Sequence, residues 1–188
     1  MARNVEIKAR VSDLAVLRRR VESMADRGPT LIEQEDTFFL CPSGRLKLRC
    51  FSDGEGEIIF YQRPDADGPR ESQYFISATP DPETLTVVLT HAYGVRGVVC
   101  KRRTLFWIGQ TRIHLDEVDD LGTFLELEVV LEEHQSTSDG IEIARNLMKD
   151  LDVSESTLVP QAYIDLLSNE KEDKRLVTQR RKAAEYVD

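Results

Sequence analysis

The stretch Gly44-Arg45-Leu46-Lys47-Leu48-Arg49 alternates cationic and leucine side chains. Because successive side chains of a β-strand point to opposite faces, this pattern predicts a strand that carries Arg45, Lys47 and Arg49 on one face. Three neighbouring cations repel one another unless their face looks onto bulk water or onto a strongly anionic group. The fold and the function both depend on whether this face meets bulk water or an anionic group.

Composition limits the possible functions. The chain has 188 residues, enough for one domain with a substantial core, and a formal net charge of −9. An acidic chain argues against general nucleic-acid binding. No apolar run is long enough to span a membrane and no secretory signal is present, so we expect a cytoplasmic protein without a membrane partner. The three cysteines and three histidines lack metal-site spacing, and we assign no role to His91, His114 or His134.

The same alternation recurs along the chain, and short turns join most of the alternating segments. We predict strands at 4–11, 31–40, 45–51, 57–63, 70–78, 96–108, 111–118 and 123–132. Amphipathic helices are expected at 13–27, 82–92 and 139–151, with a last short helix from residue 160. Ser12 is the expected N-cap of the first helix and Gly28-Pro29 its end. The pattern favours an α+β domain over residues 1–168 with one antiparallel sheet that is closed or nearly closed.

The highly charged residues 169–188 form a predicted tail. Its composition favours a solvated segment, and a helix or a partner-binding extension stays open. The sequence also leaves open whether the protein is a monomer or a homodimer.

The charged strand faces have two explanations. A half-exposed sheet with its charged face in water accounts for any one strand. The signs are segregated by strand, however, with cations at 45–49 and acids at 126–128. The apolar faces opposite also need cover, which the three helices can supply. A closed sheet with helices outside and a charged interior satisfies both faces.

Such an interior must hold water, ions or a ligand, because unpaired buried charge is costly. Arginine and lysine side chains match phosphate oxygens. Clustered carboxylates suit Mg²⁺ or Mn²⁺, which bridge to substrate phosphates. The sequence therefore predicts a tunnel that binds a small triphosphate together with a divalent cation.

These residues resemble the CYTH superfamily, which comprises class IV adenylate cyclases, thiamine triphosphatases and related triphosphate tunnel metalloenzymes. Asn4-Val5-Glu6-Ile7-Lys8 stands at the family's N-terminal Glu-x-Glu-x-Lys signature. The further matches follow in the family's order: Gln34-x-Asp36-Thr37-Phe38-Phe39, Gly44 to Arg49, Lys101-Arg102-Arg103, His114-Leu115-Asp116-x-Val118 and Leu121-Gly122-x-Phe124-Leu125-Glu126-Leu127-Glu128. The resemblance covers about residues 4–167 and is closest to the cyclase-like and thiamine triphosphatase-like members.

The resemblance implies a closed eight-stranded antiparallel tunnel and a set of roles. The metal ligands it implies are Glu6, Glu126 and Glu128, with Asp116 as a further candidate. The phosphate contacts would be Arg45, Lys47, Arg49, Arg63, Arg70, Lys101 and Arg103. Lys8 would hold phosphate or assist the attacking group.

Two departures from the family pattern bear on function. Asn4 replaces the first signature glutamate and brings no negative charge, and Tyr61-Gln62-Arg63 stands where many members have a lysine. The first hypothesis is an Mg²⁺- or Mn²⁺-dependent enzyme. It would be either a lyase that cyclises ATP to cAMP and pyrophosphate or a hydrolase of an organic or inorganic triphosphate. The alternatives are a nucleotide- or polyphosphate-binding protein with weakened catalysis and a purely structural or interaction protein.

Overall fold

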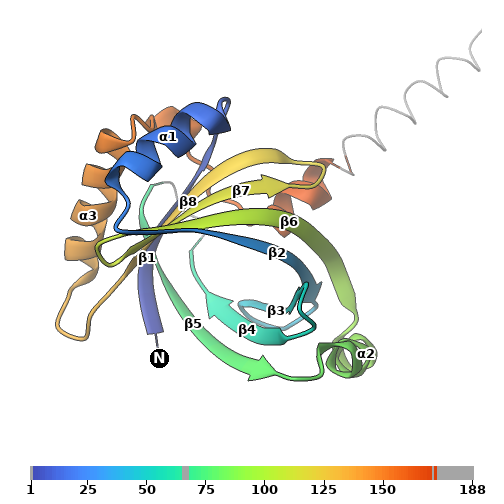
Figure 1. Ribbon diagram of the computed structural model, residues 1–188. Coiled ribbons are helices and arrows are strands. Elements are labelled where there is room, and N and C mark those ends of the chain that lie inside the picture. Colours follow the sequence, from blue (N-terminus) through green and yellow to red (C-terminus); the bar gives the residue numbers. More distant parts are fainter. Residues whose placement is uncertain (1, 65–67, 171, 173–188) are drawn as a thin grey trace, which may run out of the picture.

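Eight antiparallel strands form a closed barrel in the computed structural model, which describes residues 2–64, 68–170 and 172 (Figure 1). The order around the barrel is β1-β5-β4-β3-β2-β6-β7-β8. The strands are β1 (Ala2–Arg10), β2 (Arg27–Phe39), β3 (Arg45–Phe51), β4 (Gly56–Gln62), β5 (Arg70–Thr79), β6 (Val95–Ile108), β7 (Thr111–Val118) and β8 (Gly122–Val130). This arrangement confirms the predicted closed α+β barrel.

The barrel closes because β1 pairs with both β5 and β8. Across β1 and β8, Glu6 faces Glu128 and Lys8 faces Glu126. Strand β3 lies four strands from β8 in either direction around the barrel. The cationic strand that the sequence singled out therefore stands opposite the acidic one.

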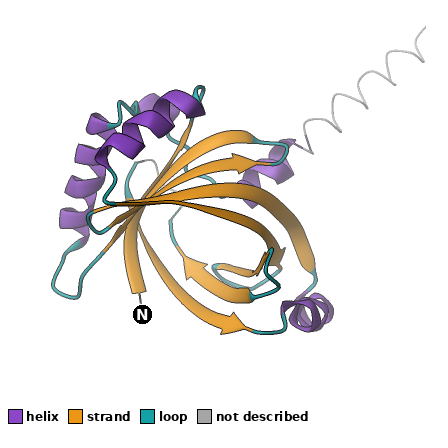
Figure 2. Cartoon of the chain, viewed as in Figure 1, coloured by secondary structure: helices purple, strands orange, loops and turns teal. Residues whose placement is uncertain are grey.

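Helices cover apolar outer faces of part of the barrel (Figure 2), whereas the outward side chain of Phe75 on β5 stays exposed. Helices α1 (Leu14–Met24) and α3 (Thr137–Asp150) pack over one side, followed by the short 3₁₀ helix η1 (Glu155–Thr157). Helix α2 (Pro82–Tyr93) packs over β2 and β3. The largest buried cluster joins the barrel to α1 and α3; it includes Ile7, Leu17, Val21, Phe106, Ile113, Leu115, Leu125, Leu127, Met148 and Leu151. None of the helices among the described residues combines the length and the apolarity needed to cross a membrane.

Residues 158–167, here called the C-terminal plug, fill one end of the barrel. The plug begins beside β1, where the Val159 amide donates to the Lys8 carbonyl at 2.9 Å. Its apolar side chains then pack where β2 and β7 end and β6 and β8 begin. That cluster comprises Phe38, Val99, Val118, Leu121, Phe124, Ala162, Tyr163, Ile164 and Leu167. Gly97 permits the close approach, because a Cβ there would lie 2.7 Å from Cδ1 of Ile164.

Two expected boundaries are wrong at the first helix. Asp13, not Ser12, is the N-cap, because its carboxylate accepts the Val16 amide at 2.9 Å. The helix ends at Met24, so that Gly28-Pro29 lies inside β2 rather than at the helix end. Gly28 has φ of 109° there, and a Cβ would lie 2.7 Å from the Leu105 carbonyl oxygen. A close backbone approach, rather than a helix terminus, therefore calls for this glycine.

The other predicted elements agree with the structure to within a few residues. The strands predicted at 45–51 and 111–118 match at both ends. A helical stretch at 163–170 follows the expected start near Pro160. Within the predicted tail, only 169, 170 and 172 are among the described residues, so the boundary between domain and tail stays a prediction.

Candidate active site: a charged cavity inside the barrel

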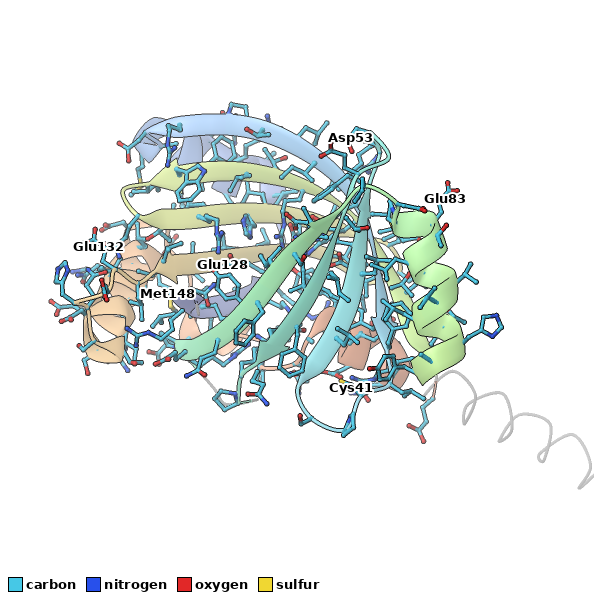
Figure 3. All side chains as sticks on the ribbon, turned by 90° about the horizontal axis from the view of Figure 1, so that it is seen from below. Cys41, Asp53, Glu83, Glu128, Glu132 and Met148 are labelled. Atoms are coloured by element: carbon cyan, nitrogen blue, oxygen red, sulfur yellow. The ribbon has the colours of Figure 1, made fainter. Side chains whose placement is uncertain are left out.

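A cavity of about 310 Å³ lies inside the barrel and is lined by residues of all eight strands and of the plug. Figure 3 shows Glu128 among the side chains between the strands. The cationic lining residues are Lys8, Lys47, Arg49, Arg63, Lys101, Arg103 and Arg112. The acidic ones are Glu6, Asp36, Glu57, Glu126 and Glu128. The structure thus brings together most of the predicted site residues, whereas Arg45, Arg70 and Asp116 lie outside the lining.

Asp36 on β2 is the anionic group that the cations of β3 require. Its carboxylate accepts Lys47 Nζ at 2.7 Å and Arg49 Nε at 2.8 Å. Burial acts to raise the pKa of Asp36, but Arg49 and Lys47 act more strongly and hold that pKa below its usual range. Asp36 stands in one of the family motifs, but the sequence predicted no role for it. Its place on the strand that pairs with β3 was the signal that could have found it.

Arg45 turns toward the plug instead of toward the cavity. Its Nη2 lies 2.9 Å from Asp165 Oδ2, and Asp165 also accepts Arg96 Nη2 at 2.5 Å. Both arginines come from the barrel, so Asp165 fastens the plug to β3 and β6. The predicted phosphate contact of Arg45 stays a prediction.

Asp116 is fully buried behind the cavity lining, where it orients two cations and the plug. It accepts Arg103 Nε at 2.7 Å, Lys101 Nζ at 3.3 Å and the Tyr163 hydroxyl at 3.0 Å. Burial raises its pKa, but Arg103 and Lys101 outweigh burial and lower the pKa of Asp116 to about 2. Because three donors already engage this carboxylate, its role as a metal ligand stays a prediction.

A cluster of potential metal ligands joins β7 and β8. Donor atoms of His114, Glu126 and Glu128 all lie within 4.8 Å of one another. Nδ1 of His114 is 3.7 Å from Glu128 Oε1 and 3.9 Å from Glu126 Oε2. Burial and the nearby Arg103 lower the pKa of His114, which keeps the imidazole neutral at pH 7. The sequence assigned His114 no role because its partners follow on the next strand rather than at a recognisable spacing.

The two carboxylates of this cluster are ionised and held by cations. Glu126 lies 3.3 Å from Lys8 Nζ and also pairs with Arg103, and Glu128 accepts Arg112 Nη2 at 2.8 Å. Burial acts to raise both pKa values, yet those of Glu126 and Glu128 are lowered, because the surrounding cations act more strongly.

Glu6 lies next to this cluster and pairs with arginines. Its carboxylate contacts Arg63, and Arg70 Nη2 is 4.0 Å away. Glu6 faces Glu128 across the strand pair but lies outside the set of mutually close donors among the described residues. Its predicted role as a metal ligand therefore stays a prediction. Asn4, two residues earlier, has a buried Oδ1 without a hydrogen-bond partner among the described residues.

Lys8 lies between the plug and the cluster of His114, Glu126 and Glu128, here called the acidic cluster. Its Nζ donates to the Gln161 carbonyl at 3.1 Å and lies 3.7 Å from the centroid of the Tyr163 ring. Burial lowers the pKa of Lys8 to about 8, although Glu126 acts to raise it. Burial likewise lowers the pKa of Lys47 to about 7. Tyr163 was not predicted as a site residue, because the plug is distant in sequence from every strand that it contacts.

Apolar side chains line the cavity away from the plug. Phe51 is the last residue of β3, Ile32 lies in the first half of β2, and Leu105 and Ile76 lie late in β6 and β5. In an antiparallel barrel these positions share the end opposite the plug. Ile76 is 49% exposed, so this end is the mouth of the cavity.

Known proteins share this fold. The PH1012 protein from Pyrococcus horikoshii OT3 is 27% identical, with a TM-score of 0.79 over 87% of this chain and 98% of that chain. A candidate adenylate cyclase from Vibrio parahaemolyticus is 20% identical, with a TM-score of 0.73 over 88% and 97% of the two chains. HpAC1 from Hippeastrum, a candidate adenylyl cyclase with a dominant triphosphatase activity, is 10% identical, with a TM-score of 0.66 over 90% and 96%. The last two are similar in fold alone.

Comparison of sequences gives the family. No curated protein matches the chain. The family model of the CYTH domain matches residues 2–163, which include every strand, the acidic cluster and the start of the plug. The chain therefore belongs to the CYTH domain family.

Proposed function

We propose that this protein is an enzyme that acts on a triphosphate bound inside the barrel, with Mg²⁺ or Mn²⁺ as cofactor. The charge of the cavity carries the proposal, because seven cationic side chains and five carboxylates line it. A triphosphate has about four negative charges near neutral pH, and a bound divalent cation reduces this to about two. The excess of cations in the lining matches that complex.

The residues of the cavity divide between phosphate and metal. Lys47 and Arg49 on β3 and Lys101 and Arg103 on β6 are fixed by Asp36 and Asp116, so their donors are positioned before a substrate arrives. Glu126 and Glu128 fit a divalent cation because their oxygens lie close together and are ionised. Such a cation polarises phosphoryl oxygens when bound. Lys8 holds a proton at Nζ, where it can stabilise charge that develops on the transferring group.

The mouth favours an organic triphosphate over inorganic tripolyphosphate. Ile32, Phe51 and Leu105 offer an apolar surface at the end opposite the plug. A phosphate chain gains nothing there, whereas a planar organic group would bury apolar area against it. Two reactions fit this pose. In cyclisation a ribose hydroxyl attacks the α-phosphate and pyrophosphate leaves, and in hydrolysis water attacks the terminal phosphate.

Product analysis tests the proposal and separates the reactions. The purified protein is incubated with ATP, thiamine triphosphate or tripolyphosphate, in Mg²⁺ or Mn²⁺. Cyclic AMP with pyrophosphate identifies a cyclase, and orthophosphate identifies a hydrolase.

We expect Glu126→Gln to lower turnover by about 100-fold, as loss of a group that stabilises transition-state charge does. Glu132→Gln, at an exposed acid outside the barrel, should leave turnover unchanged. Absence of turnover with every substrate would refute the enzyme.

Asn4 supports a second candidate, a binding protein that retains the cavity without efficient catalysis. Its neutral amide stands beside the acidic cluster, where the family signature has a glutamate. If the wild type binds triphosphate and is inert while Asn4→Glu turns over, the binding protein is favoured. If the wild type is active and Glu126→Gln is not, the binding protein is ruled out.

A further inference from the structure

One buried nitrogen of the cavity, Nδ1 of His114, faces Glu126 and Glu128 and lacks a hydrogen-bond partner in the described part of the chain. His114 is 4% exposed, and its Nδ1 accepts or donates no hydrogen bond among the described residues. A buried polar atom without a partner costs about 1–3 kcal/mol, so such an atom calls for an explanation. The atoms it faces are Glu128 Oε1 at 3.7 Å and Glu126 Oε2 at 3.9 Å, too far for hydrogen bonds.

These separations suit three ligands around one ion. Two ligand atoms at about 2.1 Å from a metal can be at most about 4.2 Å apart. Both distances from His114 Nδ1 fall below that limit, whereas the 4.8 Å within which all the donor atoms of the three residues lie is slightly wider than it. An ion that draws these atoms together would therefore satisfy the unpartnered nitrogen, and it would share Glu126 Oε2 with Arg103 Nη2.

The resulting donor set differs in kind from a cluster of carboxylates. Mg²⁺ favours oxygen ligands, whereas imidazole nitrogen suits transition ions such as Fe²⁺ and Zn²⁺, and Mn²⁺, although it also takes oxygen ligands, accepts an imidazole more readily than Mg²⁺ does. The neutral Asn4 stands where the family signature has its first glutamate. The missing negative charge further weakens the attraction for a hard cation.

We propose that His114 Nδ1, Glu126 and Glu128 form a mixed nitrogen–oxygen metal site that favours a transition ion such as Mn²⁺ over Mg²⁺. The inference rests on the proposed function for its premise that a cation accompanies the triphosphate. It adds a nitrogen ligand from β7 and a metal preference that a carboxylate site lacks.

Spectroscopy of bound Mn²⁺ tests the nitrogen ligand without reference to activity. Metal-free protein is titrated with Mn²⁺ alone, binding is followed by electron paramagnetic resonance, and electron spin-echo modulation reports on directly bound nitrogen. We expect one tight site in the wild type, with modulation typical of a coordinated imidazole. Bound Mn²⁺ that requires Glu126 and lacks this modulation would overturn the nitrogen ligand, and so would failure to bind Mn²⁺.

Variants assign the nitrogen to its residue. His114→Asn keeps a short neutral donor in place of the ring, and we expect it to abolish the modulation and weaken Mn²⁺ binding by about 10- to 100-fold with little change for Mg²⁺. His134→Asn, at an exposed histidine outside the barrel, should retain both. Modulation that persists in a folded His114→Asn protein would refute the assignment.

The outcomes separate this inference from the proposed function. Nitrogen coordination without turnover of any triphosphate would support the metal site and remove the enzyme. Turnover without nitrogen coordination would support the enzyme and remove His114 from the metal.

Discussion

Asp36 pairs with two of the three cations of β3 and so reduces the repulsion between them. It holds Lys47 and Arg49 at hydrogen-bond distance, and burial lowers the pKa of Lys47 to about 7 even so. A lysine with such a pKa is only partly protonated near neutral pH, whereas a phosphate oxygen binds the protonated form. Ligand binding and protonation of this residue are therefore linked.

Affinity for a triphosphate should fall as the pH rises from 7 to 9. The pKa values of Lys47 and Lys8 in the free protein, about 7 and about 8, lie below the ordinary lysine value, and a bound polyanion raises them. Binding therefore takes up protons in this range, and each proton taken up weakens affinity by about tenfold per pH unit. Calorimetry with a non-hydrolysable analogue, in two buffers of different protonation enthalpy at pH 8, measures the uptake.

Lys47→Arg is the matched control for this prediction. A guanidinium stays charged throughout the range and can still pair with Asp36, so the variant should take up fewer protons than the wild type. Equal uptake by both proteins would show that Lys47 is not the linked group.

Among the elements, the strands were easier to predict than the contacts between them. Alternation placed β3 and β7 correctly at both ends, because period-two burial determines both the strand and its inner face. The role of Asp36 follows from the register between β2 and β3, which places it opposite Arg49. The role of His114 follows from its pairing with Glu126 on β8, the strand after the next turn. The side-chain hydrogen bonds between the plug and the barrel join residues 47 to 153 positions apart, which no local pattern reports. The sequence therefore predicted the barrel and most of its charged lining, but not how those charges pair.

The plug should lose stability when its hydroxyl is removed. Tyr163→Phe keeps the ring, which packs edge-on against Phe124 with centroids 5.0 Å apart, and deletes the donor to the buried Asp116. We expect a loss of about 1–2 kcal/mol in the free energy of unfolding, measured by urea denaturation. Tyr93→Phe, at an exposed position on α2, should change it by less than about 0.5 kcal/mol. Equal effects of the two changes would contradict the role given to the hydroxyl.

The whole molecule combines an acidic exterior with an interior in which cations outnumber carboxylates. A triphosphate with its cation offsets the repulsion inside the barrel, so binding should stabilise the fold. At 100 times its dissociation constant a ligand adds about 2.7 kcal/mol, which corresponds to about 5–10 °C in melting temperature for a chain of this size. Differential scanning calorimetry with the non-hydrolysable analogue and Mn²⁺ measures this shift.

One cation of the cavity lining and one cation of the surface provide the comparison. Arg49→Gln removes a cation of the cavity lining, and we expect it to lose most of the ligand-induced shift. Arg102→Gln removes an exposed cation whose side chain pairs with Glu117 outside the barrel, and it should keep the shift. A full shift in both variants would place the ligand outside the cavity.

The plug also determines the order in which molecules can pass through the barrel. Among the described residues, residues 158–167 pack into one end of the barrel, and Phe51 and Ile76 line the cavity toward the other end, so we expect a molecule that reaches the acidic cluster to use the mouth at Phe51 and Ile76. A substrate that enters with its phosphates foremost leaves its organic fragment nearest the exit. If the protein has the proposed activity, we expect that fragment to depart first and the deeper phosphate product to depart last. The deeper product should then inhibit competitively with respect to substrate, whereas the shallower product should not.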